Sequence, residues 1–599
     1  MKAQPTTPRT LRTILTATLF PALWLLLTVP SGQAGSATWN LNPTSGNWNT
    51  AANWTPATVP NGPTDIATFA TSSNTAISLS AAVQVNSITF NSSANSFSIT
   101  SIPQRPLTVS GTGIINNSGV KESFIIGQDD SGNENGITFN QSASAGISTA
   151  FAVMGGEDAG VGTGGTLLFH DTSTAGSGSF DVFGAAPRAF TGGRILFWDS
   201  STAGNAAIAI HPGGSVNFAN TSSLANGTIT NDDGGLYFLN DATGGDGTIT
   251  NGASLESGGG VFFNTSSAGN VTVTNNGASG ASDFGYTSIE VSAATGTFIN
   301  NGGNGSGATG GITAFIGGGA NGATSTLIAN GGTSGGLGGT ITFSESSDGG
   351  SARVELFGNG TLDISGHNLA GVTIGSLEGD GLVSLGASPL TIGSSNLSTT
   401  FSGLIQGSGR ITKTGKGTLT LSGANTYTGG TTISRGTLRA TNTSGSATGT
   451  GSIQISGGIL GGTGIMAGET SIGPGTTAVA ILEPSAGGKK PATLTIQSAL
   501  HFKGSTFNYQ LDTRRAQGDL VVANGVSIED QDGFNFTALR NSPLTVGQVF
   551  VVISNTSATP ISGTFGNLAD DATFKAGRNK FQADYEGGDG NDLTLTVVP

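Results

Sequence analysis

The chain has little of what many functional classes depend on. It has no cysteine and 4 histidines, and charged residues make up 10% of its 599 positions. Without cysteine it forms no disulfide, so its stability has to come from backbone hydrogen bonds and stacked side chains. The sequence contains no HExxH motif and no paired Cys/His set, which are the usual signatures of a zinc site. Because its formal net charge is -14, nucleic acid is not an expected partner.

Glycine and phenylalanine are abundant instead. The chain has 100 glycines and 30 phenylalanines, and its hydrophobic residues amount to 35%. This composition excludes a coiled coil and a bundle of membrane helices. It also argues against disorder, because phenylalanine, isoleucine, leucine and valine recur at regular spacing along the sequence.

One stretch shows the local pattern most clearly. Residues 403–439 read GLIQGSGRITKTGKGTLTLSGANTYTGGTTISRGTLR. Apolar residues alternate there with threonine or serine, which indicates strands with one buried face. Glycines supply the turns between the strands, and no amphipathic helix is present to connect them. The pattern predicts about one and a half turns of a β-solenoid.

The same stretch resembles a known family. Within it, KTGKGTLTLSGANTYTGGTTISRGTL (Lys413–Leu438) is similar to the autotransporter-associated β-strand repeat of bacterial exported passenger proteins. The resemblance implies a parallel β-helix that a Gram-negative-type bacterium secretes or displays on its surface. It does not imply any single activity.

A longer internal repeat lies between Gly164 and Gly381. Six copies share a glycine pair, a strand ending near a phenylalanine, a polar turn and a second strand. Their period, about 20 to 28 residues, is the length of one β-helix coil, and coils lie about 4.8 Å apart. The phenylalanines predicted to stack inside the helix are Phe169, Phe197, Phe218, Phe238, Phe263 and Phe343. Residues 280–336 lose the clean register, which predicts irregular coils or a bulging loop there.

The amino terminus reads as a secretory signal. Lys2, Arg9 and Arg12 precede an apolar run over residues 14–29, and Gly-Gln-Ala at 32–34 offers a cleavage site. We expect the mature chain to begin at Gly35. The alternative is a transmembrane anchor, but Pro21 interrupts the run, which falls short of about 18 clean apolar residues.

The mature chain opens with Trp39, Trp48 and Trp54. Aromatic residues on an exported protein can form a platform that stacks on sugars. A cluster of Trp, Asn and Pro just before the first coil is, however, what covers the open end of a solenoid, so we expect a structural cap.

The predicted fold is all-β, a right-handed parallel β-helix (β-solenoid) with an N-terminal cap and a C-terminal β-domain. The predicted divisions are a signal peptide at 1–34, an N-terminal β cap region at 35–109, β-helix repeats at 110–475 and a C-terminal β-domain at 476–599. The last division follows from a change in composition, because charges rise and glycine thins after about residue 482.

The segment after the repeat bears on export. Autotransporters in the narrow sense end in a membrane barrel of alternating strands about ten residues long. The residues after the repeat motif end in Val597, Val598 and Pro599, without the terminal aromatic strand of such a barrel. We therefore expect separate export machinery.

The best cluster of catalytic residue types is His170, Asp171, Asp181, Asp199 and His211, beside Trp198. β-Helices that cleave polysaccharides need carboxylates and cations on adjacent coils. The structural interpretation is a ladder of turns, in which each coil places a short polar side chain at the same position. In the aligned copies, Asp171 and Asp199 are followed by Asn220 and Asn240, with Asn264 one place early. We favour the turn ladder.

One short motif suggests calcium. Residues 587–595, GGDGNDLTL, match the glycine and aspartate positions of the calcium nonapeptide. A single copy offers fewer oxygens than the six to eight ligands that calcium takes, so a tight turn is favoured.

The sequence therefore favours an exported, non-enzymatic, extracellular or cell-surface solenoid, associated with the outer membrane, in a structural or adhesive role. The alternative is a β-helix polysaccharide lyase or glycoside hydrolase. We assign no catalytic, cofactor-binding or metal-binding residue and expect no cofactor. Expected partners are a cell-surface or extracellular polysaccharide, or other surface proteins.

Overall fold

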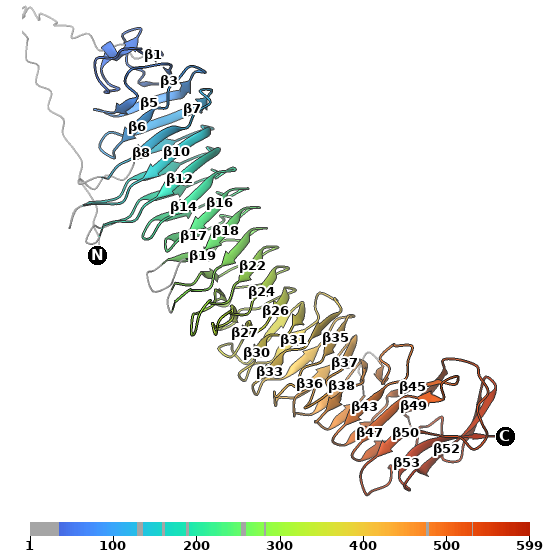
Figure 1. The fold of residues 1–599 in the computed structure, drawn as a ribbon. Helices are drawn as coiled ribbons and strands as arrows, with labels where there is room; N and C mark the ends of the chain where they lie inside the picture. The colour runs from blue at the N-terminus through green and yellow to red at the C-terminus, as the bar shows by residue number, and fades with distance from the viewer. Residues whose placement is uncertain are drawn as a thin grey trace, which may run out of the picture.

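The structure is a computed structural model that describes residues 35–128, 136–157, 162–186, 191–252, 259–280, 283–474, 479–529 and 531–599. The predicted signal peptide at residues 1–34 lies outside the described residues. Figure 1 shows a long rod of stacked β-coils. The described ranges contain one short 3₁₀ helix, η1 (Ala51–Asn53). In the part of the chain that the structure describes, no helix has the length and apolar character needed to span a membrane.

Two long sheets run along most of the rod, and we name them sheet A and sheet B. Sheet A contains β1 (Ala37–Trp39), β2 (Trp54–Thr55), β3 (Gly62–Phe69), β5 (Val83–Phe90), β7 (Leu107–Asn116), β9 (Ile137–Phe139), β11 (Thr166–Phe169), β13 (Arg194–Phe197), β15 (Ser215–Phe218), β17 (Gly235–Leu239), β19 (Gly260–Asn264), β21 (Tyr286–Ile289), β23 (Ile312–Phe315), β25 (Thr340–Phe343), β27 (Thr361–Asp363), β30 (Leu382–Ser384) and β33 (Leu404–Gln406).

Sheet B contains β4 (Ala76–Ser78), β6 (Ser98–Ser101), β8 (Glu122–Ile126), β10 (Ile147–Val153), β12 (Ser177–Val182), β14 (Ala207–Ile210), β16 (Thr228–Asn231), β18 (Thr248–Asn251), β20 (Thr272–Asn275), β22 (Thr297–Asn300), β24 (Thr326–Ala329), β26 (Arg353–Leu356), β29 (Ser376–Gly379), β32 (Thr399–Phe401), β35 (Thr418–Leu421), β37 (Thr437–Ala440), β39 (Gly458–Gly462), β42 (Ala480–Leu482), β45 (Thr506–Asp512), β46 (Gln517–Gly518) and β49 (Gly533–Ala538).

Two further sheets belong to the carboxy-terminal part. Sheet C contains β28 (Val372–Ile374), β31 (Leu390–Ile392), β34 (Ile411–Lys413), β36 (Thr431–Ile433), β38 (Ile453–Ile455), β41 (Thr470–Ile472), β44 (Leu500–Phe502) and β48 (Val526–Ile528). Sheet D contains β40 (Ile465–Met466), β43 (Thr493–Ile496), β47 (Leu520–Ala523), β50 (Val549–Asn555), β53 (Asp592–Val598), β52 (Asn579–Gly587) and β51 (Thr573–Ala576).

The coil follows from the two-residue period of the sequence. In β15, Val216 and Phe218 point inward and are buried, whereas Ser215 and Asn217 face outward. β15 pairs in parallel with β13 on one side and β17 on the other, so these three strands belong to successive coils. The predicted parallel β-solenoid is confirmed.

The predicted phenylalanine ladder is also confirmed. Phe169, Phe197, Phe218, Phe238 and Phe263 are fully buried, and successive rings stack with centroids 4.6 to 4.9 Å apart. The ladder starts one coil earlier than predicted, at Phe139. Between Phe263 and Phe343 the site is occupied by Ile289 and then by Phe315, on which Phe343 stacks at 4.4 Å.

A second interior ladder consists of buried asparagines that the sequence analysis did not single out. Asn231, Asn251, Asn275 and Asn300 are paired residues at the ends of β16, β18, β20 and β22. Each side-chain amide donates to the carbonyl oxygen of the next, over 3.0, 2.9 and 2.9 Å. The amides therefore satisfy one another where no water reaches them.

Of the irregular coils or bulging loop predicted over residues 280–336, the strands show no irregularity and loops are present. β21, β22, β23 and β24 keep the register of their neighbours. The extra glycine-rich residues form the loops 301–311 and 330–339, which pair with each other at Asn304 and Thr333. Because these loops stack coil on coil, the variable spacing in the sequence does not disturb the ladder inside.

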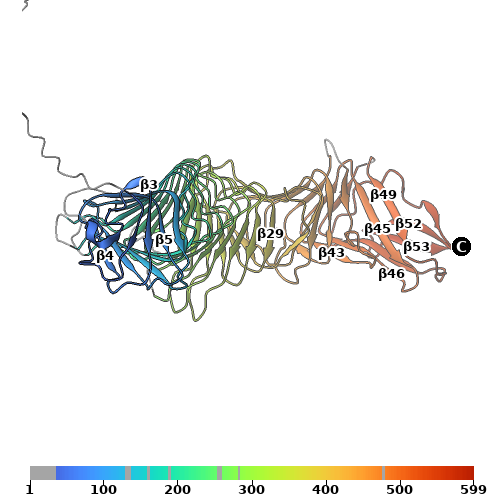
Figure 2. The same ribbon diagram turned by 90° about the horizontal axis from the view of Figure 1, so that it is seen from above.

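The rod is capped at both ends, and Figure 2 shows β4 and the strands β52 and β53 at opposite ends of it. Trp39, Trp48 and Trp54 are at most 1% exposed and pack on one another and on Phe69, so the predicted structural cap is confirmed and a sugar platform of these rings is excluded. At the other end β50, β53, β52 and β51 pair antiparallel and close the sheet.

The boundaries predicted at 109/110 and 475/476 are not breaks in the coil stacking. Parallel pairing already joins β1 to β3 and β3 to β5. It continues past residue 476, where β42 pairs with β45 and β41 with β44. The change in composition near residue 482 marks longer strands and charged loops on the same solenoid.

Candidate functional site

The predicted histidine and aspartate cluster forms two separate pairs. His170 Nδ1 lies 3.2 Å from Asp199 Oδ2, at a corner that follows the strands of sheet A. His211 Nε2 lies 3.2 Å from Asp181 Oδ1, and both belong to sheet B or its edge. Trp198 is 42% exposed and its ring lies beside His170. The structure therefore does not bring the five predicted polar residues into one site.

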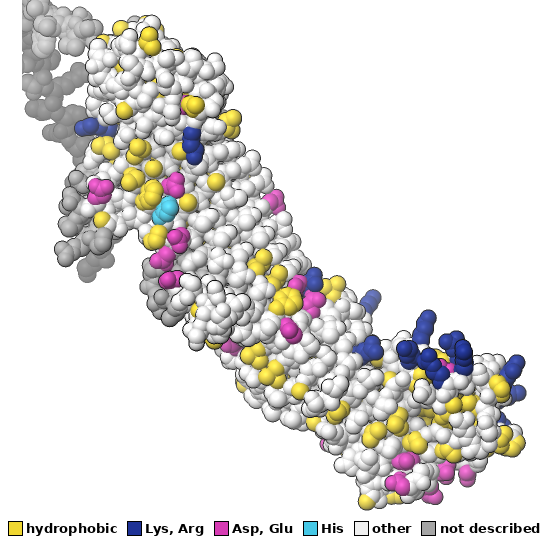
Figure 3. All heavy atoms as spheres, viewed as in Figure 1, with side chains coloured by type: hydrophobic (Ala, Val, Ile, Leu, Met, Phe, Trp, Pro, Cys, Tyr) yellow, Lys and Arg dark blue, Asp and Glu magenta, His cyan; other side chains and the backbone are white. Residues whose placement is uncertain are grey.

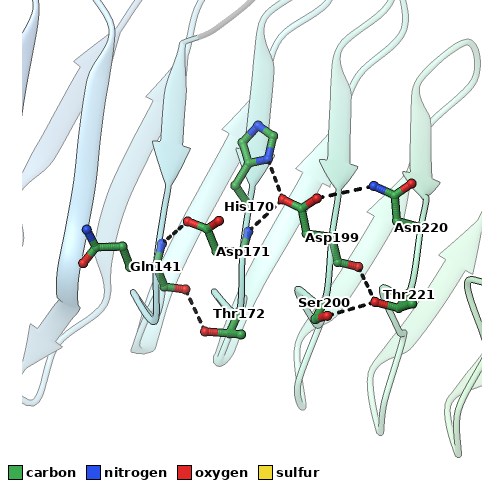
Figure 4. Close-up of polar contacts among 8 residues, drawn as sticks. All are labelled: Gln141, His170, Asp171, Thr172, Asp199, Ser200, Asn220 and Thr221. Carbon is green, nitrogen blue, oxygen red and sulfur yellow. Dashed lines mark hydrogen bonds and ion pairs between the residues drawn. The ribbon is translucent and has the colours of Figure 1, made fainter.

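The corner with Asp199 is a turn ladder (Figure 4). Asp171, Asp199, Asn220 and Asn240 have positive φ angles of 55°, 56°, 59° and 59°, a left-handed conformation that aspartate and asparagine tolerate well. On the next coil Thr265 takes this position, because Asn264 is still paired within β19.

The carboxylates of this corner hold neighbouring coils together. Asp171 Oδ2 accepts a hydrogen bond from the backbone N–H of Gln141 at 2.8 Å, and Asp199 Oδ2 accepts one from the N–H of Asp171 at 3.2 Å. The pKa of Asp199 is lowered, first by the backbone hydrogen bond from Asp171 and then by His170. A carboxylate stabilised in its ionised form is a poor general acid, so the corner has the chemistry of a structural turn.

Two buried polar residues of the 403–439 stretch, Lys413 and Asn425, are structural as well. Lys413 is 2% exposed, and its ammonium group donates to the carbonyl oxygens of Thr414, Gly415 and Arg435. Burial lowers its pKa to about 8. Asn425 bridges two coils, accepting from the N–H of Ile405 and donating to the carbonyl of Ala447. These two side chains of the repeat motif therefore hold neighbouring segments of the coil together.

An open groove on the outer face of sheet B is the best candidate site. It has a volume of about 640 Å³ and crosses β26, β29, β32, β35 and β37. It is lined by Arg353, Glu355, Phe357, Glu378, Gly379, Ser398, Thr399, Thr400, Thr418, Thr420 and Arg439. These side chains face outward because the alternate residues of the same strands, such as Val354, Leu377 and Leu438, are buried.

One end of this sheet B groove is an ion-pair network. Glu355 and Glu378 are paired residues on neighbouring strands, and Arg353 Nε contacts Oε1 of each, at 3.0 Å and 2.5 Å. The hydrogen bond to Glu378 is the main reason that the pKa of Arg353 is raised. The Phe357 side chain beside the network is 41% exposed.

The rest of the groove is a shelf of hydroxyl groups that ends in a cation. Thr400 pairs with Thr420, and Thr420 pairs with Arg439, so the three side chains follow one another across three coils. The groove thus offers an aromatic ring, several hydroxyls and two cations balanced by two carboxylates. It suits an extended, uncharged ligand rich in hydroxyl groups.

Sequence reasoning missed this groove. Arg353 and Arg439 lie far apart in the sequence, and only the strand register brings them to one face. The sequence does show that polar residues of these strands face outward, because polar and apolar residues alternate in RVEL (Arg353–Leu356), TLTL (Thr418–Leu421) and TLRA (Thr437–Ala440).

The residues 587–595 form a hairpin turn. Gly587 pairs with Asp592 at the ends of β52 and β53, and Gly590 N–H donates to the carbonyl of Gly587 at 3.0 Å. The predicted turn is confirmed. Across the described ranges, no group of three or more His, Cys, Asp and Glu side chains is placed to hold a metal ion.

Comparisons with known proteins give one family match. No curated protein sequence matches the chain. Among solved structures, the chain is similar to the crystal structure of the Haemophilus influenzae Hap adhesin, with 11% identity and a TM-score of 0.24 over 89% of this chain and 64% of that chain. The chain thus spans less than two thirds of that structure's length. Residues 411–440 match the family model of the passenger-associated-transport-repeat, so the chain carries this repeat in the segment that its sequence indicated.

Proposed function

We propose that the chain is an exported, non-enzymatic solenoid that binds an extended neutral polysaccharide at the cell surface or outside the cell. Export is supported by the passenger-associated-transport-repeat at residues 411–440. The expected partners, a polysaccharide outside the cell and a separate export machinery, remain part of this proposal.

The observation that carries the binding role is the sheet B groove. Its floor is a continuous parallel sheet, so its side chains stand at fixed spacing on rigid strands. Phe357 can stack on the apolar face of a sugar ring, and the threonine hydroxyls and Arg439 can hydrogen-bond to sugar hydroxyls. Because the two cations are balanced by two carboxylates, a neutral polymer fits better than a charged one.

The same geometry argues for binding without turnover. Cleavage of a glycosidic bond uses one carboxyl group as an acid and a second carboxylate as base or nucleophile. Here Glu355 and Glu378 share a single guanidinium, that of Arg353. Among the residues that line the groove there is no further carboxylate to take the second role.

The test is a binding assay with neutral polysaccharides combined with assays for reducing sugar and unsaturated product. We expect saturable binding without product. Thr420→Arg should weaken binding at least ten-fold, because it fills the groove, whereas Thr230→Arg, an outward position on the same sheet far from the groove, should leave it unchanged. Product formation that is lost in Arg353→Ala or Asp199→Ala would establish the enzyme alternative instead, and equal binding by both threonine variants would exclude the groove.

A further inference from the structure

Charge is distributed unevenly along the rod. Residues 401–599 contain 14 of the 22 lysines and arginines, whereas residues 35–400 contain 23 of the 36 acidic residues. Figure 3 shows Lys and Arg side chains gathered along one edge of the carboxy-terminal end, with Asp and Glu on the opposite side. An acidic protein therefore presents a local positive surface.

Six exposed cations from four loops make up this surface, which we name the cationic edge. Two loops follow β42 and β45, one follows β49, and the fourth connects β51 to β52. The six residues are Lys489, Lys490, Arg514, Arg515, Arg540 and Arg578, all of them exposed.

Hydrogen bonds between the loops place these cations in a row along the rod. The N–H of Ala492 donates to Asp519 Oδ1 at 2.7 Å, which joins the first loop to the residue after β46, the short strand that follows the second loop. The N–H of Ser542 donates to Thr513 Oγ1 at 3.0 Å, which joins the second to the third. The N–H of Arg578 donates to Asn541 Oδ1 at 2.9 Å, which joins the third to the fourth.

The protein does not use these charges internally. In the part of the chain that the structure describes, no side chain of the cationic edge forms an ion pair or a hydrogen bond. The adjacent carboxylates of Asp512 and Asp519 are at most 5% exposed and accept backbone N–H groups. Exposed like charges that lie near one another without ion-pair partners repel one another, and a bound polyanion would relieve that repulsion.

We propose that the cationic edge binds an acidic polysaccharide, with the polymer running parallel to the rod axis. Successive coils lie about 4.8 Å apart, which is close to the length of one sugar residue in an extended chain. A polymer with one carboxylate or phosphate per sugar would therefore meet a cation at each coil. This surface is separate from the sheet B groove, whose charges balance and whose expected ligand is neutral.

The test measures binding of the full chain to polygalacturonate at low ionic strength, with dextran as the neutral reference. We expect saturable binding to polygalacturonate that weakens as salt rises. Changing Lys489, Lys490, Arg514 and Arg515 to serine should weaken it at least ten-fold. The matched control changes Lys121, Arg410, Lys416 and Arg435 to serine, which alters net charge equally at exposed sites elsewhere, and should change affinity less than two-fold.

Three results would overturn the proposal. They are undiminished binding by the edge variant, equal loss in the edge and control variants, and binding to double-stranded DNA as tight as to polygalacturonate, which would show attraction to any polyanion. A second variant, Lys489→Glu with Lys490→Glu, changes a single exposed loop and keeps the test decisive if the four-fold variant does not fold. If this variant still binds neutral polysaccharide, the cationic edge and the sheet B groove are separate binding sites.

Discussion

Phe218 and Phe238 stack face to face inside the solenoid, with ring centroids 4.9 Å apart and ring planes inclined by 6°. They are paired residues of β15 and β17, and both are fully buried. Each ring therefore forms part of the wall of the other's site. Replacing one with alanine leaves a cavity beside the other, and the second replacement then removes contacts that are already partly lost.

We expect each of Phe218→Ala and Phe238→Ala to destabilise its coils by about 3 to 5 kcal/mol. The double variant should be non-additive, with a coupling of about 0.5 to 1.5 kcal/mol. Because a solenoid opens locally, the measurement is native-state hydrogen exchange over residues 215–239. Phe218 with Phe343 is the matched control, since several coils separate them and their effects should add. Additivity of the stacked pair would contradict a coupled ladder.

The asparagine ladder makes a different prediction. Asn275 donates to Asn300 Oδ1 at 2.9 Å and accepts from Asn251 at 2.9 Å and from the Thr287 hydroxyl at 2.8 Å. Asn275→Ala removes the hydrogen-bond partner of the buried Asn251, Asn300 and Thr287 side chains. Hydrogen-exchange protection of β18 to β22 should therefore fall by about 2 to 4 kcal/mol. The exposed Asn226→Ala is the control and should cost less than about 0.5 kcal/mol. A loss in Asn275→Ala as small as in this control would show that water replaces the amide.

Much of this interior could be read from the sequence, because its repeat aligns strand with strand. The phenylalanines recur after a glycine pair and a short apolar run. The sequence therefore predicts correctly that the rings from Phe169 to Phe263 stack inside the solenoid. The asparagine ladder follows the same logic. It was overlooked because an asparagine at the end of a TITN strand looks like a turn residue until the sheet shows it to be buried.

The sheet B groove and the cationic edge could not be predicted from the repeat. Their residues share no motif, and they meet only because loops of different length let distant strands come into register. Arg353 and Arg439, for example, lie on the same outer face although the coils between them differ in length. Over residues 280–336 the sequence predicted irregular coils or a bulging loop. The loops are present, but they stack on one another and leave the strands regular.

The buried lysine of the repeat predicts a dependence on alkaline pH. Burial lowers the pKa of Lys413 to about 8, whereas an unfolded lysine titrates near about 10.4. Between these values the unfolded state binds more protons than the native state, so the free energy of unfolding should rise with pH. The rise is at most about 3 kcal/mol. Hydrogen exchange over residues 404–440, corrected for the intrinsic rate at each pH, measures it. Lys413→Met should abolish the slope, and an equal slope in that variant would assign it to another group.

Asp519 predicts the opposite slope at acidic pH. It is fully buried between the N–H of Ala492 at 2.7 Å and the N–H of Gln510 at 3.0 Å, and burial raises its pKa to about 6.

Because an unfolded aspartate titrates near about 3.9, the native state binds more protons than the unfolded state between that pH and about 6. The stabilisation is therefore complete below about pH 4 and is lost as pH rises through about 6, a change of at most about 3 kcal/mol. It is measured as the midpoint of thermal unfolding of the carboxy-terminal coils between pH 4 and pH 7. Asp519→Asn should lower stability at pH 4, because its amide cannot accept from both N–H groups, and should flatten the pH dependence. Asp571→Asn, at an exposed position, should leave the slope intact. A slope that persists in Asp519→Asn would show that another carboxyl group controls the stability of this end of the rod.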